Sequence, residues 1–135
     1  MGKDQVASVV AENHPTPAQK IILLVEDNPT LSKIMQRTIE TCTSHRVIHL
    51  SDGETILAKI AEHKPDLLIF DHDLPGRNGI ELYDFVHATE GCEHIPAILI
   101  SAELPQEQIA RRNLPSLSKP YKTSVLLDLL EDVLV

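Results

Sequence analysis

Residues 67–76 read LLIFDHDLPG, and this stretch decides the fold. Its first part, Leu67–Phe70, is a continuous apolar run that is too short for a helix, so it predicts a strand buried on both faces. The turn that follows carries two carboxylates, Asp71 and Asp73, together with the breakers Pro75 and Gly76. Charge at the carboxyl end of a buried strand is typical of a ligand site in a parallel sheet.

Four more apolar runs predict strands, and they lie at Ile21–Val25, Val47–Leu50, Ala97–Ile100 and around Leu117. The segments between them have helical periodicity. The first helix can be capped by Asn28 or Asp27 with Pro29 in its first turn. Its apolar stripe, which we expect to face the sheet, consists of Leu31, Ile34, Met35 and Ile39. Further helices are expected after residues 51–53, after Gly79, over 106–112 and over 123–134.

Strict alternation of strands and helices predicts an α/β domain, because every crossover is long enough to contain a helix. We expect a doubly wound five-stranded parallel sheet in the order 2-1-3-4-5, a flavodoxin-like three-layer sandwich. Residues 1–20 show no sustained apolar period and contain two prolines close together, so we interpret them as an N-terminal tail or linker. The domain itself should span residues 21–135.

The amino-acid composition argues against several classes of function. The 135 residues fit one domain, and a net charge of −8 opposes direct binding to nucleic acid or anionic lipid. No apolar stretch is long enough for membrane insertion. Cys42 and Cys92 lie far apart without metal-binding spacing, which favours a reduced, cytoplasmic location. The seven histidines are scattered, so we expect His72, His87 and the others to be surface or partly buried side chains.

Polar residues end four of the predicted strands, and in this topology they should meet in one crevice: Glu26, Asp27, Asp71, Ser101 and Lys119. Three carboxylates at short range repel one another, so one should be protonated at neutral pH unless a cation lies among them. Oxygen ligands suit Mg²⁺, which also bridges carboxylate and phosphoryl oxygens. A hydroxyl and a lysine can bind the remaining phosphoryl oxygens.

Four motifs in the expected order resemble the signatures of response-regulator receiver domains of two-component phosphorelay systems. They are Val25-Glu26-Asp27-Asn28, DHDLPGRNG over residues 71–79, Ile100-Ser101-Ala102 and Ser118-Lys119-Pro120-Tyr121. The resemblance runs from about Ile21 to the last residue. No single motif is decisive, but four of them in register with the strand pattern are specific together.

The resemblance implies roles for these residues. Asp71 would be the phospho-acceptor, and Asp27 would bind Mg²⁺ directly. Glu26 would hold the ion mainly through water, and the backbone carbonyl of Asp73 would be a further ligand. Ser101 and Lys119 would contact the phosphoryl group, with a cis peptide bond between Lys119 and Pro120.

The resemblance also implies partners: a histidine kinase or histidine phosphotransfer protein as donor, and a downstream protein target. Such a domain is not an enzyme in the usual sense, although it assists its own phosphorylation and dephosphorylation. No effector domain follows Val135 in this sequence, so the unit is either a single-domain regulator or the receiver of a hybrid kinase.

Two rival functions remain open. Phe70-Asp71-His72-Asp73 also reads as the DxD motif of a haloacid-dehalogenase-like phosphatase, but Leu74-Pro75 follows it and there is little room for a cap domain. A pseudo-receiver, which binds partners without phosphorylation, is the second rival. Taken singly, Glu26-Asp27 could be a polar strand end, Ser101 a loop residue and Lys119 a surface lysine; only their combination favours the site.

One feature departs from the family. Ser116 stands three residues before Lys119, where many receivers carry a Tyr or Phe that rotates on activation. The stretch from Ala102 to Leu117 also looks short. We therefore expect signalling through rearrangement of residues 102–118 without a rotating aromatic ring.

Overall fold

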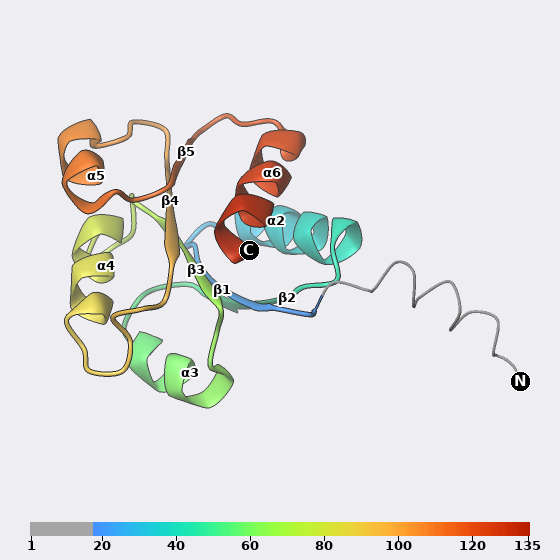
Figure 1. Ribbon diagram of the computed structural model, residues 1–135. Helices are drawn as coiled ribbons and strands as arrows, with labels where there is room; N and C mark the ends of the chain where they lie inside the picture. Colours follow the sequence, from blue (N-terminus) through green and yellow to red (C-terminus); the bar gives the residue numbers. More distant parts are fainter. Residues whose placement is uncertain (1–17) are drawn as a thin grey trace, which may run out of the picture.

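The computed structural model describes residues 18–135, and most of the predicted N-terminal tail lies outside that range. In the described part, five strands alternate with helices and form one parallel sheet in the order β2-β1-β3-β4-β5 (Figure 1). The predicted fold and strand order are confirmed. The elements are β1 (Ile21–Val25), α2 (Pro29–Cys42), β2 (Arg46–Leu50), α3 (Ile56–His63), β3 (Leu67–Asp71), α4 (Gly79–His87), β4 (Ala97–Ser101), α5 (Gln106–Arg112), β5 (Ser116–Ser118) and α6 (Thr123–Leu134).

The sheet is the middle of three layers. Helices α2 and α6 cover one face, and α3, α4 and α5 cover the other (Figure 1). Successive residues of a strand point to opposite faces, so Ile69 packs in the cluster with α2 and α6, whereas Phe70 packs in the cluster with α3 and α4. Both clusters consist of buried apolar side chains, most of them aliphatic, around the three central strands. This packing fixes the strand ends that carry the polar residues.

Helix α2 begins as predicted. Asn28 is its N-cap, and the Asn28 Oδ1 atom accepts hydrogen bonds from the amides of Thr30 and Leu31 at 2.9 and 3.1 Å. These contacts satisfy amides that have no partner within the helix. The cap sets the direction in which the chain leaves the end of β1.

The predicted apolar stripe of α2 is only half correct. Met35 and Ile39 are buried against the sheet, but Leu31 and Ile34 are 41% and 58% exposed. Ser32 is buried in their place, and its hydroxyl donates to the carbonyl of Pro29 at 3.1 Å. Because the hydroxyl has a partner within the helix, its burial is tolerated and the helix can turn two apolar side chains outward.

Helix α4 begins very close to the end of β3. An Asn78–Glu81 capping box starts the helix. A Cβ atom at Gly79 would lie 2.8 Å from the Cα atom of His72 and 2.9 Å from the carbonyl oxygen of Asp71. Only glycine allows this approach, so the turn after Asp71 is enclosed by backbone.

Strands β3 and β4 are each one residue longer than predicted. Asp71 remains paired with Ile100, and Ser101 remains paired with Ser118. Both polar side chains therefore start from buried, regular backbone instead of a loop. Within residues 18–135, no helix is long and apolar enough to cross a membrane.

Candidate functional site

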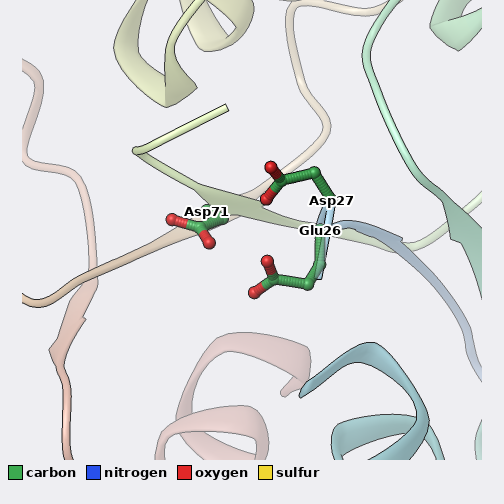
Figure 2. A group of neighbouring side chains, drawn as sticks. All are labelled: Glu26, Asp27 and Asp71. Atoms are coloured by element: carbon green, nitrogen blue, oxygen red, sulfur yellow. The ribbon is translucent and has the colours of Figure 1, made fainter. Parts of the chain in front are cut away.

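Three carboxylates meet at the carboxyl edge of the sheet. Glu26 and Asp27 follow β1, and Asp71 ends the neighbouring strand β3. One oxygen from each side chain lies within 4.8 Å of the other two (Figure 2). Glu26 and Asp71 are buried, whereas Asp27 is exposed, so the cluster opens toward solvent on one side.

Backbone amides orient two of these carboxylates. The amide of Asn28 donates to Glu26 Oε2 at 3.1 Å, and the amide of Asp73 donates to Asp71 Oδ1 at 2.9 Å. Each donor lies two residues after its acceptor, so the turns that end the strands hold the side chains in place. The second oxygen of each carboxylate is left for other partners.

Lys119 supplies the positive charge of the site. Its Nζ atom donates to Asp71 Oδ2 at 2.9 Å and lies 3.6 Å from Glu26 Oε1. The amide of Lys119 donates to the carbonyl of Ser101 at 2.9 Å, which keeps the end of β5 beside β4. The peptide bond between Lys119 and Pro120 is cis, as predicted.

The buried carboxylates do not share the same protonation state. Burial and, next in size, the hydrogen bond with the Asp71 carboxylate together raise the pKa of Glu26 from 4.5 to about 7. In the metal-free site, therefore, the protonated and ionised forms of Glu26 coexist near pH 7, and the protonated form donates to Asp71. The expected protonation of one carboxylate falls on Glu26.

Asp71 behaves oppositely. Burial by itself would raise the pKa of Asp71, but hydrogen bonds from the Asp73 amide, the Glu26 carboxyl and Lys119 outweigh burial and lower it. Burial by itself would lower the pKa of Lys119, but the hydrogen bond and charge of Asp71 outweigh burial and raise it. The acceptor candidate is thus an anion that faces a cation.

Ser101 is not brought into this group. It is fully buried, and its Oγ atom both accepts from the amide of Glu103 and donates to the carbonyl of Glu103, each at 3.1 Å. Ser101 belongs to the alternating set of β4 residues that faces α4 and α5, whereas Asp71 faces α2 and α6. Its side chain must rotate before it can contact anything held by Asp71.

The donor set suits a hard divalent cation. All three clustered side chains offer oxygen, one of them is exposed, and the raised pKa of Glu26 shows that its negative charge is poorly compensated without a further cation. Mg²⁺ prefers oxygen ligands and retains several waters, which an open three-carboxylate cluster allows. The residues present therefore fit Mg²⁺.

A doubly wound α/β domain with an acidic cluster and a lysine at its carboxyl edge is the arrangement of a phosphorelay signalling module. The family model for the response regulator receiver domain matches residues 22–131. This chain belongs to that family, and a receiver domain is a signalling domain rather than an enzyme in the usual sense.

Individual relatives agree with this assignment. The chemotaxis protein CheY of Pseudomonas aeruginosa is 28% identical over 116 residues, which cover 83% of this chain and 94% of that protein. The sensory/regulatory protein RpfC of Xanthomonas campestris is 28% identical over 120 residues, which cover 84% of this chain but 16% of RpfC. Relatives thus include both single-domain regulators and longer regulatory proteins.

Solved structures share the fold. The receiver domain of sensor histidine kinase PA1611 from Pseudomonas aeruginosa, described with a magnesium ion coordinated in the active site cleft, is 25% identical with a TM-score of 0.74. The match covers 86% of this chain and 98% of that structure. CheY4 of Vibrio cholerae superposes with a TM-score of 0.77 at 23% identity, over 86% of this chain and 99% of that structure.

Sequence patterns missed two histidines that border the site. His49 Nε2 lies 2.8 Å from the backbone oxygen of Glu26 and supports the end of β1 from β2. His72 follows Asp71 directly, and its Nδ1 atom is buried without a hydrogen-bond partner. Neither residue has a spacing or motif that could have indicated these positions.

Proposed function

We propose that Asp71 accepts a phosphoryl group from phosphohistidine of a partner protein. A carboxylate oxygen of Asp71 attacks phosphorus and forms an acyl phosphate. The phosphorus–nitrogen bond breaks with its electron pair returning to nitrogen, and the imidazole, protonated on its other ring nitrogen, leaves as a neutral group. The observation that carries this proposal is the 2.9 Å contact between Lys119 Nζ and the buried Asp71 carboxylate. The contact keeps the nucleophile ionised and places a cation beside the incoming charge.

The acidic cluster would hold Mg²⁺. Asp27 and Asp71 would bind it directly, the backbone carbonyl of Asp73 would add a ligand, and Glu26 would act mainly through water. Bound there, the ion would neutralise charge on the carboxylates and on phosphoryl oxygens. Lys119 would pair with one phosphoryl oxygen, and Ser101 would donate to another after rotating away from Glu103.

These groups would let the domain assist its own phosphorylation and dephosphorylation. Their contribution is positioning and charge neutralisation, since phosphoryl transfer needs little other chemistry from the protein. The side chain of Asp73 is exposed next to Asp71 and would border the path of a hydrolytic water.

The donor would be a histidine kinase or a histidine phosphotransfer protein, and a groove beside the cluster fits such a partner. The groove has a volume of about 500 Å³, lies between α2 and α6, and reaches from Glu26 and Lys119 to exposed Leu31 and Ile34. An apolar surface that leads to the nucleophile can bind a helix beside its phosphohistidine. The two free cysteines, Cys42 and Cys92, fit a cytoplasmic setting for this exchange.

The output would be a downstream protein that recognises the changed surface. The haloacid-dehalogenase-like alternative, with Asp71 as nucleophile and Asp73 as acid/base, is not favoured by the family match. A pseudo-receiver would keep the fold without phosphoryl uptake, and the experiment below separates it from a phospho-acceptor.

The test is intact-mass measurement after incubation with acetyl phosphate and Mg²⁺. The wild-type protein should gain one phosphoryl group, and Asp71→Asn or excess chelator should prevent the gain. Asp132→Asn, an exposed carboxylate on α6, is the matched control and should be phosphorylated normally. Uptake that persists in Asp71→Asn would refute Asp71 as the acceptor, and no uptake by the wild type would favour a pseudo-receiver.

A further inference from the structure

The side chain of His72 contains an unsatisfied buried atom. Among the residues that the structure describes, His72 Nδ1 is the one buried side-chain nitrogen or oxygen without a hydrogen-bond partner. The residue as a whole is half-buried. An unpaired buried polar atom is unfavourable, so a partner for Nδ1 in another arrangement of the site would stabilise that arrangement.

His72 lies beside Ser101 on the sheet. The amide of His72 donates to the carbonyl of Ile100 at 2.8 Å, which continues the β3–β4 ladder by one position beyond the Asp71–Ile100 pair. In that register the partner of His72 is Ser101. Ser101 is the last residue of β4, and His72 follows the end of β3 in a bend, so the backbone of His72 lies beside Ser101 at the carboxyl edge of the sheet.

Rotation of Ser101 would release the backbone amide of Glu103, which follows Ser101 by two residues. In the structure, Ser101 Oγ accepts from the amide of Glu103 at 3.1 Å. A hydroxyl that turns toward a phosphoryl group on Asp71 abandons that amide. The Glu103 amide then lacks an acceptor, while the buried Nδ1 atom of His72, whose backbone pairs with the residue before Ser101, has no partner.

We propose that His72 is a positioning residue whose Nδ1 atom accepts a hydrogen bond from the Glu103 amide in the phosphorylated state. The proposal rests on the proposed function, because it requires Ser101 to turn toward Asp71. In the neutral imidazole with its proton on Nε2, Nδ1 is an acceptor, and Nε2–H can be hydrated at the accessible side. His72 thereby holds the segment after Ser101 in its shifted position and favours the phosphorylated arrangement.

The test compares His72→Phe with His72→Asn in binding beryllofluoride with Mg²⁺, a phosphoryl mimic. Phenylalanine retains a ring without an acceptor, whereas an asparagine oxygen can occupy the region of Nδ1. His72→Phe should bind beryllofluoride about three- to tenfold more weakly than wild type. His72→Asn should restore most of the affinity.

Two further readouts exclude a merely structural role. The urea midpoint of the resting His72→Phe protein should equal or exceed that of wild type, because the variant removes an unpaired buried atom. On adding beryllofluoride, the Glu103 amide proton should shift downfield in wild type and His72→Asn but not in His72→Phe. His72→Leu provides a smaller apolar replacement if the phenyl ring prevents folding.

Several results would overturn the inference. Equal beryllofluoride affinity in wild type and His72→Phe would do so, as would an Asn variant as weak as the Phe variant. A loss of affinity matched by a lower resting midpoint in both the Phe and Leu variants would assign His72 to packing alone. Failure of the wild type itself to bind beryllofluoride would instead refute the proposed function, and this inference with it.

Discussion

Lys119 Nζ donates a 2.9 Å hydrogen bond to Asp71 Oδ2, although the two residues are 48 positions apart in the chain. The contact exists because β3 and β5 end at the same edge of the sheet on either side of β4. Together with hydrogen bonds from the Asp73 amide and the Glu26 carboxyl, it lowers the pKa of Asp71 against the effect of burial. One ion pair thus connects the stability of the domain to the phosphoryl transfer proposed for Asp71.

Replacing Lys119 with Met should separate these two effects. Uptake from acetyl phosphate should slow on the order of 100-fold, because a charged donor to the phosphoryl group is lost. Without Mg²⁺, the free energy of unfolding at pH 7 should fall by about 1–3 kcal/mol, since Asp71 loses its partner. Intact mass over time and urea titration in chelator are the measurements.

The stability difference should depend on pH. A lowered pKa of Asp71 stabilises the fold above the ordinary value of an aspartate, and this stabilisation is lost as pH falls through the folded-state pKa. The wild type and Lys119→Met should therefore converge in stability at low pH. Lys122→Met, an exposed lysine three residues on, is the control and should match wild type.

Binding of Mg²⁺ should strengthen with pH because of Glu26. The metal-free site has a Glu26 pKa of about 7, so a proton competes with the ion below that pH. The dissociation constant for Mg²⁺ should rise by up to about tenfold from pH 8 to pH 6 and level off above pH 8. Glu26→Gln should remove most of this dependence, whereas a wild-type constant independent of pH would contradict the protonation of Glu26.

Asp73 should tune the lifetime of the phosphoryl group. Its side chain is exposed beside Asp71, and only its backbone is expected to bind the ion. Asp73→Ala should change the rate of dephosphorylation, measured from the decay of the phosphorylated mass after the donor is removed. Affinity for Mg²⁺ should stay close to that of wild type, and its loss would instead make the side chain a ligand.

The exposed apolar side chains of α2 should affect the rate of phosphoryl transfer from a protein donor but not from acetyl phosphate. Ile34→Ser should slow transfer from a phosphorylated kinase or phosphotransfer protein by about five- to tenfold, as expected for one apolar contact in an interface. Uptake from acetyl phosphate should be unchanged, because Ile34 lies on the groove and not in the carboxylate cluster. Ala58→Ser, at an exposed site on α3, should alter neither reaction.

Some of the structural features behind these predictions could be inferred from the sequence, and others could not. Strand order and the meeting of Glu26, Asp27, Asp71 and Lys119 could be predicted, because buried apolar runs and parallel strand ends leave little choice of topology. Which face of α2 packs against the sheet could not be predicted. Ser32 is buried and Ile34 is exposed, and the apolar periodicity of the helix sequence does not encode this packing.

The hydrogen-bond partners and burial of individual side chains could not be predicted from the sequence either. The order of residues predicts that Ser101 follows β4, but not that its hydroxyl is held by Glu103. Likewise, nothing about His72 in sequence distinguishes a buried, unpaired Nδ1 from an ordinary surface imidazole. Such features depend on rotamers and on neighbours from other strands.

Phosphorylation should rearrange residues 102–118 without a rotating aromatic. Ser116 is half-buried at the start of β5 and has no ring to move into space that Ser101 vacates. Ala102 is covalently attached to Ser101, so the following loop must move with it. Helix α5 is easily displaced, because Ile109 is its one buried residue and its link to α4 is an Arg112–Asp84 ion pair at 2.7 Å on the surface.

Amide NMR spectra with and without beryllofluoride and Mg²⁺ test this rearrangement. A change in preference of a few kcal/mol between two arrangements is enough to alter which partner binds. The largest shifts outside the carboxylate cluster should fall in residues 102–118, and Asp71→Asn should remove them. Large shifts confined to residues 27–45, with residues 102–118 unmoved, would place the output surface on α2 instead of α5, because the segment attached to Ser101 would then have stayed in place.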